Sequence, residues 1–184
     1  MADTQHKHNS LQGKLLVATP KLNKTMWAET VIYLVDHDVR SGAVGFVLNR
    51  LSNTPVNSLM DAFKYKHADF PEIIHMGGPL KERNIHMLHS GDWYSASTAP
   101  VTQEISWSYD DFMLEKMAGF DTPRDWTVFA GYSAWQRSQL EQEIVDGSWL
   151  VVDTNPAIVF ATDRSYLYDL AVDCAGQQMI ETFF

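Results

Sequence analysis

Two apolar segments near the start of the chain are separated only by a short turn. They read TVIYLVDH (30–37) and AVGFVLNR (43–50), and the residues between them are DVRSG (38–42). Both segments are rich in β-branched and aromatic residues, which favour strands. So short a connection joins antiparallel neighbours, because a parallel pair needs a crossover of about a dozen residues or more. The sequence therefore predicts a hairpin, and it disfavours a fold of strictly alternating parallel strands and helices.

The rest of the chain mixes short apolar runs with amphipathic helical segments. Further strands are expected at 14–19, 84–89, 101–107, 126–132, 148–153 and 157–162. About four helices are expected, at 55–65, between 108 and 119, at 133–146 and after Asp163. Because strands and helices interleave irregularly, the expected architecture is an α/β (α+β) fold with a mixed β-sheet and flanking helices. A length of 184 residues is typical of a single compact domain.

Helix starts are assigned from residues that cap helices well. Serine, threonine and aspartate side chains accept hydrogen bonds from the first free backbone N–H groups of a helix. The last helix carries an apolar stripe that includes Cys174, so the only cysteine is expected to be a small buried hydrophobic residue. The assigned caps are Thr54 ahead of Pro55, Ser108 with Asp111, Ser133 with Gln136, and Asp163; the stripe is Leu167, Leu170, Ala171 and Cys174.

The two ends of the chain are polar and apolar respectively. Residues 1–12 are predicted to be disordered, which leaves 13–184 as the folded domain. They lack the apolar core of a signal peptide, and no apolar run reaches the roughly 20 residues of a membrane helix. A cytoplasmic protein with no membrane segment is expected. The terminal Phe183 and Phe184 suit either a packed C-terminus or a partner contact.

The charge is distributed unevenly and opposes nucleic-acid binding. The formal net charge is −9, and residues 85–184 carry four Lys/Arg against fifteen Asp/Glu. Residues 1–84 carry ten Lys/Arg against eight Asp/Glu, without a basic stripe. Binding to DNA depends on clustered cations that neutralise phosphates. Direct, specific DNA binding is therefore not expected.

The sequence HMGGPLKERNIHMLH (75–89) raises the question of a phosphate or metal site. It matches neither the Walker pattern nor the dinucleotide fingerprint, and Pro79 removes an amide donor. Gly77 and Gly78 are interpreted as a tight turn or a close backbone approach. A metal would have to be bound by His75, His86 and His89. However, His86 and His89 point to opposite faces if 84–89 is a strand, so ordinary hydrogen-bonded histidines are favoured.

Ser133 lies in the strand–turn–helix context of a nucleophile elbow. That pattern requires G-x-S-x-G, but Trp135 occupies the place of the second glycine. No histidine follows His89, although a triad in another chain order stays possible in principle. Helix capping explains Ser133 without catalysis.

Several short motifs follow one another along the chain: LLVATPKL, VIYLVDHD, GAVGFVLNR, MGGPL, LH and GYSAWQRSQLEQEIVDGSWLVV. Their order resembles that of the AlgH/YqgE family of bacterial proteins, and the resemblance covers roughly residues 13–170. The resemblance implies a mixed sheet that curls toward a barrel. It implies no established enzymatic activity. Transcriptional regulation is attached to the family's name without a recognised DNA-binding motif.

The resemblance also implies a set of candidate binding residues. Ala134 stands where the family usually has glycine, and the sequence QRSQ replaces a Gly/Pro-containing loop, so Ala134 and Arg137 are expected to reduce the space there. The C-terminus is expected to diverge after about Asp173. The candidates are Asn49, Arg50, Gly77, Gly78, Pro79, His89, Gly131, Ser133, Trp135, Gln139 and Glu141.

Two functions of different class follow. The favoured one is a non-enzymatic interaction or regulatory domain that binds a protein or a small molecule. The alternative is a hydrolase or metal-dependent enzyme that uses His75, His86, His89 or Ser133. No catalytic residue, metal ligand or cofactor is assigned, because none of these patterns is specific.

Overall fold

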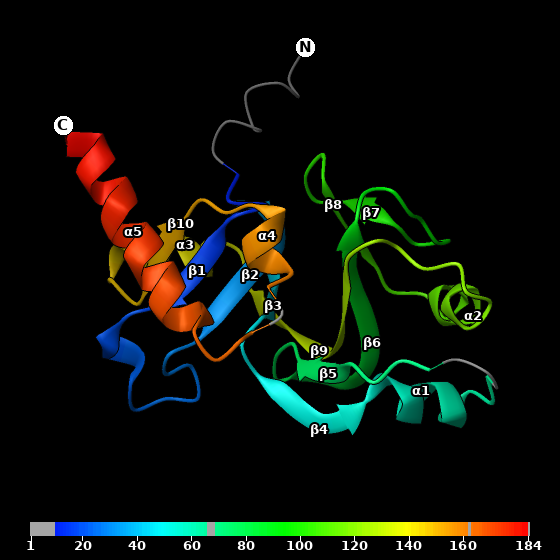
Figure 1. The fold of residues 1–184 in the computed structure, drawn as a ribbon. Coiled ribbons are helices and arrows are strands. Elements are labelled where there is room, and N and C mark those ends of the chain that lie inside the picture. The colour runs from blue at the N-terminus through cyan, green and yellow to red at the C-terminus, as the bar shows by residue number, and fades with distance from the viewer. Residues whose placement is uncertain (1–9, 66–68, 162, 184) are drawn as a thin grey trace, which may run out of the picture.

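A computed structural model describes residues 10–65, 69–161 and 163–183 of the chain. The strands form one 10-stranded sheet that curls, with helices packed on both of its ends (Figure 1). The strand order is β10-β1-β2-β3-β9-β6-β8-β7, with β5 beside β9 and β4 beside β5. Only the pairing of β5 with β9 is parallel among the described strands. The predicted single-domain α+β fold with a mixed, curling sheet is confirmed.

The strands are short apart from β2, β6 and β9. Their bounds are β1 Leu15–Ala18, β2 Val31–Asp38, β3 Gly42–Val47, β4 Leu51–Pro55, β5 Ile73–Met76, β6 Leu80–Ser90, β7 Ala99–Pro100, β8 Ile105–Ser108, β9 Trp126–Trp135 and β10 Trp149–Val152. The helices are the 3-10 turn η2 Pro20–Leu22, α1 Val56–Ala62, α2 Phe112–Ala118, α3 Gln139–Val145, α4 Pro156–Val159 and α5 Leu167–Phe183. None of the helices in the described part of the chain combines the length and the hydrophobicity needed to cross a membrane.

The predicted hairpin forms the middle of the sheet. Strands β2 and β3 pair antiparallel, with a register shift between Leu34 and Asp36. Strand β9 joins this hairpin to the rest of the sheet, because its last residues pair with β3 while its earlier residues lie between β5 and β6. The motif residues of β3, β5 and β9 therefore meet at one junction.

Three apolar clusters hold the sheet and helices together. The first packs α5 against one face of the sheet and includes Tyr33, Phe46 and Phe129, which are fully buried. The second lies around Trp135 and Trp149, next to α3. The third joins α1 and α2 to β5, β6 and β9. Cys174 is half-buried against the first cluster, which agrees with its interpretation as a small hydrophobic residue.

Most of the predicted helix caps are wrong. Thr54 belongs to β4, and Ser108 is the last residue of β8. Ser133 lies inside β9, and α3 begins only at Gln139. Asp163 accepts a bond from the backbone N–H of Ser165, but α5 starts later, at Leu167. Thr54, Ser108 and Ser133 lie in strands because tertiary pairing outweighs local preference, whereas Asp163 forms a local turn with Ser165.

The strand predictions need three corrections. The sequence predicts a strand at 157–162, but α4 begins at Pro156, where the Asn155 side chain caps the N–H of Ile158. Within 101–107 the strand begins only at Ile105. The residues before it form a turn, in which Thr102 Oγ1 accepts hydrogen bonds from the backbone N–H groups of Glu104 and Ile105. Strands β4, β5 and β7 were missed because they are short, and β4 and β5 also pair with an irregular register.

The described part of the N-terminal segment is attached to the fold. Ser10 Oγ donates to the His37 carbonyl, and the Leu11 N–H donates to His37 Nδ1 at 3.0 Å. Gln12 Nε2 donates to the Val101 carbonyl at 2.9 Å. Residues 10–12 of the segment predicted to be disordered are thus hydrogen-bonded to the fold, whereas residues 1–9 lie outside the described residues, as does Phe184.

Candidate functional site

The Gly77–Gly78–Pro79 motif connects β5 to β6 by passing directly over β9. The Gly77 N–H donates to the Ala130 carbonyl at 2.9 Å. Its carbonyl accepts bonds from the Val47 N–H at 2.9 Å and from Ser133 Oγ at 3.2 Å. The motif is thus bonded to β3 and β9 at once, which confirms the interpretation as a close backbone approach.

Both glycines lie where a side chain would not fit. A Cβ on Gly77 would lie 2.4 Å from the Gly131 carbonyl oxygen, and one on Gly78 would lie 2.3 Å from the Tyr132 carbonyl carbon. Gly131 itself has φ of 70°, a left-handed conformation that glycine adopts without steric cost. Opposite it, residues 81–84 bulge out of β6, because the pairing passes from Leu80–Tyr132 directly to Ile85–Ala130.

Asn49 and Arg50 hold the loop that precedes β2. Asn49 accepts a bond from the Val31 N–H at 2.9 Å and donates to the Glu29 carbonyl at 2.7 Å. Arg50 donates to the Met26 carbonyl at 2.8 Å and to the Ala28 carbonyl at 3.1 Å. These two candidates therefore position the loop that carries Trp27.

The Glu143 side chain, which comes from α3, accepts three hydrogen bonds. Its carboxylate accepts from the indole N–H groups of Trp135 and Trp149, at 2.9 and 2.8 Å, and from Gln139 Nε2 at 2.9 Å. The Trp149 ring also meets Trp27 and Trp135 edge-on, with centroid distances of 6.0 and 6.1 Å. Glu143 was missed in the sequence, where it is one acidic residue among several on a helix.

Glu141 pairs with a residue that the sequence did not single out. His37 Nε2 donates to Glu141 Oε1 at 2.8 Å, and His37 is almost fully buried. Since His37 Nδ1 accepts a bond from the Leu11 N–H, the imidazole carries its proton on Nε2. Glu141 thus anchors the N-terminal segment through His37.

Two depressions adjoin each other at the motif junction, and we call them together the Trp27 groove. They have volumes of about 150 and 130 Å³ and share Trp27 and Pro79 in their walls. Ala134 is exposed and lines the first depression. The candidate residues that line the groove are Arg50, Gly78, Pro79, Ser133, Trp135 and Gln139.

The candidate metal ligands lie at different places. Within the residues that the structure describes, no group of three or more His, Cys, Asp or Glu side chains is arranged to hold a metal. His86 contacts Phe46 and Tyr132, whereas His89 contacts Trp93 and accepts a bond from Ser108 Oγ at 2.9 Å. The predicted placement of the two on opposite faces of a strand is confirmed.

All three histidines are buried and held neutral. Burial, and then the positive charge of Arg164, lower the pKa of His75 to about 4, although a bond to the Leu48 carbonyl opposes the shift. Burial, and then Lys81, lower the pKa of His86 to about 4. Burial also lowers the pKa of His89.

Ser133 lacks the partners of a nucleophile. Its residue is 1% exposed, and its hydroxyl donates to the Gly77 carbonyl, which is no general base. Catalytic serines need a histidine or another base within hydrogen-bond reach. No described histidine bonds to Ser133.

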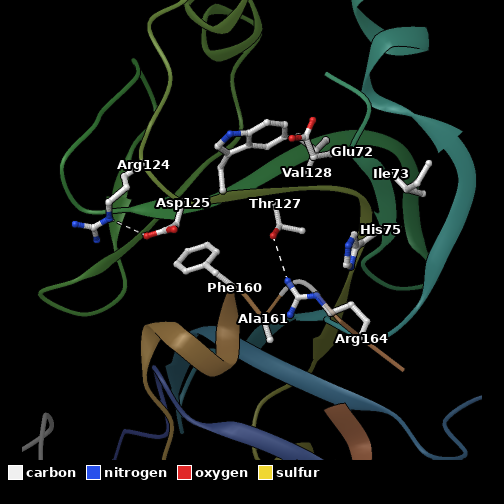
Figure 2. A pocket seen from close by; sticks show the side chains of 11 residues that line it. Glu72, Ile73, His75, Arg124, Asp125, Thr127, Val128, Phe160, Ala161 and Arg164 are labelled. Atoms are coloured by element: carbon white, nitrogen blue, oxygen red, sulfur yellow. Dashed lines mark hydrogen bonds and ion pairs between the residues drawn. The ribbon is translucent and has the colours of Figure 1, made fainter. Parts of the chain in front are cut away.

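A second pocket lies away from the groove, between β5, β9 and the segment that follows α4. It has a volume of about 300 Å³ and shares no lining residue with the Trp27 groove. Figure 2 shows His75, Thr127 and Arg164 gathered at one end and the Arg124–Asp125 pair at the other. We call this the Arg164 pocket. Arg164 was not among the sequence candidates, because a single arginine beside an aspartate carries no motif.

Comparison with known proteins places the sequence in a family. The AlgH-like family pattern matches residues 15–180. The chain belongs to the AlgH-like family. The match extends beyond Asp173, so the expected divergence of the C-terminus is wrong up to residue 180.

Relatives and solved structures agree with this assignment. A UPF0301 protein of Methylococcus capsulatus is 33% identical over 171 residues, which cover 92% of this chain and 93% of the relative. A UPF0301 protein of Gluconobacter oxydans is 35% identical over 160 residues, with 84% and 85% covered. The solution structure of the AlgH protein from Pseudomonas aeruginosa superimposes with a TM-score of 0.78 at 28% identity, over 91% of this chain and 90% of that one. A Corynebacterium diphtheriae protein shares the fold with a TM-score of 0.70 at 21% identity, over 92% of each chain.

Proposed function

We propose that this AlgH-like chain is a non-enzymatic interaction domain with a regulatory role, and that it binds an apolar segment of a partner protein in the Trp27 groove. The observation that supports this most is the convergence of the family-motif residues on two adjoining depressions that share Trp27 and Pro79. The alternative, a hydrolase or metal-dependent enzyme that uses His75, His86, His89 or Ser133, has less support, because the Ser133 hydroxyl bonds to the Gly77 carbonyl and no metal-binding group forms among the described residues. A cytoplasmic location, inferred from the sequence, is kept as part of the proposal.

The groove has the composition of a peptide-binding surface. Trp27 is half-buried, so one part of its ring is available for contact. Met26 and Leu80, which line the two depressions, are 57% and 42% exposed. Aromatic and methionine side chains are enriched in the cores of protein interfaces, where they are desolvated on binding. The hydrogen bonds of Glu143 and Arg50 fix the walls, which lowers the ordering cost of binding.

Photo-crosslinking in cells tests the groove directly. A benzoylphenylalanine at Met26 should give one dominant crosslinked product, because the partner covers that side chain. Leu80→Glu should reduce that product at least fivefold, since a charge is placed in an apolar contact. The same crosslinker at Tyr166, which is 69% exposed, is the matched control. Equal products from Met26 and Tyr166, or a product that survives Leu80→Glu in a protein with unchanged thermal unfolding, would contradict the proposal.

Direct and specific DNA binding is not expected. Two of the cations in the N-terminal half already have partners: Lys14 pairs with Asp153, and Lys21 donates to the Asp146 carbonyl. Any residual binding should be weak and should collapse between about 50 and 200 mM salt, as phosphate-driven association does. Fluorescence anisotropy with a mixed DNA pool checks this. Sub-micromolar affinity at the higher salt would restore a role in direct promoter recognition.

A further inference from the structure

Arg164 is a buried cation without a carboxylate partner. The residue is 9% exposed. Its guanidinium donates to the Val159 carbonyl at 2.7 Å and to Thr127 Oγ1 at 3.3 Å, both neutral groups. No ion pair to Arg164 is formed among the described residues. A guanidinium has five N–H donors, so part of its capacity stays unused within the described structure.

The charge of Arg164 persists at neutral pH. Burial lowers the pKa of Arg164 to about 10, which is still well above 7. A buried charge is costly unless an opposite charge or several hydrogen bonds compensate it. The acidic residues of the pocket are occupied or peripheral, because Asp125 pairs with Arg124 at 2.9 Å and Glu72 is exposed at the rim. The guanidinium of Arg164, at one end of the pocket (Figure 2), therefore carries a positive charge that no carboxylate of the described residues pairs with.

His75 adds a hydrogen-bond acceptor at the same end. Its Nδ1 lies 2.8 Å from the Leu48 carbonyl and must carry the proton, since a carbonyl only accepts. In the neutral imidazole Nε2 is then an acceptor, and no described residue bonds to it. Thr127 Oγ1, which accepts from Arg164, keeps its own proton free to donate. The end of the pocket thus combines free guanidinium donors, a hydroxyl donor and an imidazole acceptor.

We propose that the Arg164 pocket binds a small organic anion. Its carboxylate or phosphate group takes the free N–H groups of Arg164, and a hydroxyl on the same ligand donates to Nε2 of His75. Guanidinium groups match both oxyanions geometrically, and charge-assisted hydrogen bonds of this kind are the strong ones. A volume of about 300 Å³ is at the lower end of small-molecule pockets, which suits a metabolite rather than a polymer. This site is independent of the Trp27 groove.

Titration of the wild-type protein with defined anions tests the proposal. The probes are inorganic phosphate, glycolate, acetate and chloride, at constant ionic strength and pH 7.5. The readout is the side-chain Nε–Hε resonance of Arg164 in NMR spectra, assigned by its loss in Arg164→Gln. Phosphate or glycolate should shift this resonance with saturation, and the stronger of the two identifies the anionic group. Chloride should not shift it, and acetate should bind more weakly than glycolate because it has no hydroxyl for His75.

Two variants distinguish specific binding in the Arg164 pocket from nonspecific attraction of anions to the positive charges of the protein. Arg164→Gln should weaken binding of the better probe about tenfold or more, measured by calorimetry. Arg83→Gln removes an exposed charge outside the pocket and should change the affinity less than about twofold. Absence of a saturable shift with both phosphate and glycolate would overturn the proposal even if Arg164→Gln did not fold. Equal losses in the two variants would overturn it as well, and equal binding of acetate and glycolate would remove His75 from it.

Discussion

Gly78→Ala is expected to destabilise the protein by about 3 kcal/mol or more, which for a domain of this size lowers Tm by roughly 10 °C. The added Cβ would lie 2.3 Å from the Tyr132 carbonyl carbon and 2.4 Å from its oxygen. Both are backbone atoms of β9, so no side chain can rotate away to make room. Relief would require β9 to separate from the β5–β6 connection, which breaks the junction on which the Trp27 groove is built.

Gly176→Ala is the matched control for this prediction. Gly176 lies inside α5, and nothing lies within 4 Å of the place of its Cβ. Alanine is the better helix former, so this variant should gain about 0.5 to 1 kcal/mol. Urea denaturation of both variants at pH 7.5 measures the two effects. If the free energy of unfolding of Gly78→Ala lies within about 0.5 kcal/mol of the wild-type value, the backbone of β9 does not approach Gly78 as closely as described.

A large loss of stability is expected between about pH 6.5 and pH 4. His75 and His86 have a folded-state pKa of about 4, against the ordinary histidine pKa of 6.5 that holds for the unfolded chain. Between these pH values the two histidines are protonated in the unfolded state but stay neutral in the folded state. The histidine contribution is therefore fully present above pH 6.5 and is lost as pH falls toward 4. Each shift corresponds to about 3 kcal/mol, and the lowered pKa of His89 acts in the same direction.

His86→Leu tests which group causes the acid sensitivity. Burial leaves His86 Nε2 without a hydrogen-bond partner in the described structure, and the ring packs against Phe46 at a centroid distance of 5.2 Å. Leucine fills this site without titrating. It also removes the Nδ1 acceptor of the Trp107 indole N–H, a 3.3 Å hydrogen bond whose loss lowers stability equally at pH 7.5 and pH 4. The free energy of unfolding should therefore fall by about 3 kcal/mol less in the variant than in the wild type between pH 7.5 and pH 4. Identical pH profiles would show that His86 is not held neutral in the folded protein.

The buried position of His86 also determines the cost of truncating its side chain. Substitution of a solvent-exposed histidine by alanine typically costs within about 0.5 kcal/mol. Because His86 is 6% exposed among aromatic rings, His86→Ala removes packed volume and should cost more than that. Gly78 still carries the larger expected effect, since its neighbours are main-chain atoms.

Local sequence determined the central hairpin, the strands at β1, β2, β3 and β10, and the close approach at Gly77–Gly78. β-Branched runs, short connections and paired glycines are preferences of neighbouring residues, so they are visible without a fold. Motif order determined the family. The odd number of residues between His86 and His89 was enough to place them on opposite faces of β6. These features depend on distances along the chain.

Tertiary structure decided what the sequence left ambiguous. Ser108 and Ser133 can cap helices, but pairing with β6 and with β3 draws them into strands, because a sheet gains its hydrogen bonds from residues far along the chain. The Trp27 groove forms only where the loop before β2, the Gly77–Gly78–Pro79 turn and α3 lie next to one another. Arg164 is an ordinary surface residue by sequence, and only the packing of its segment against β5 and β9 buries its charge beside His75. Burial and convergence are properties of long-range contacts, and for that reason they could not be predicted from the order of the residues.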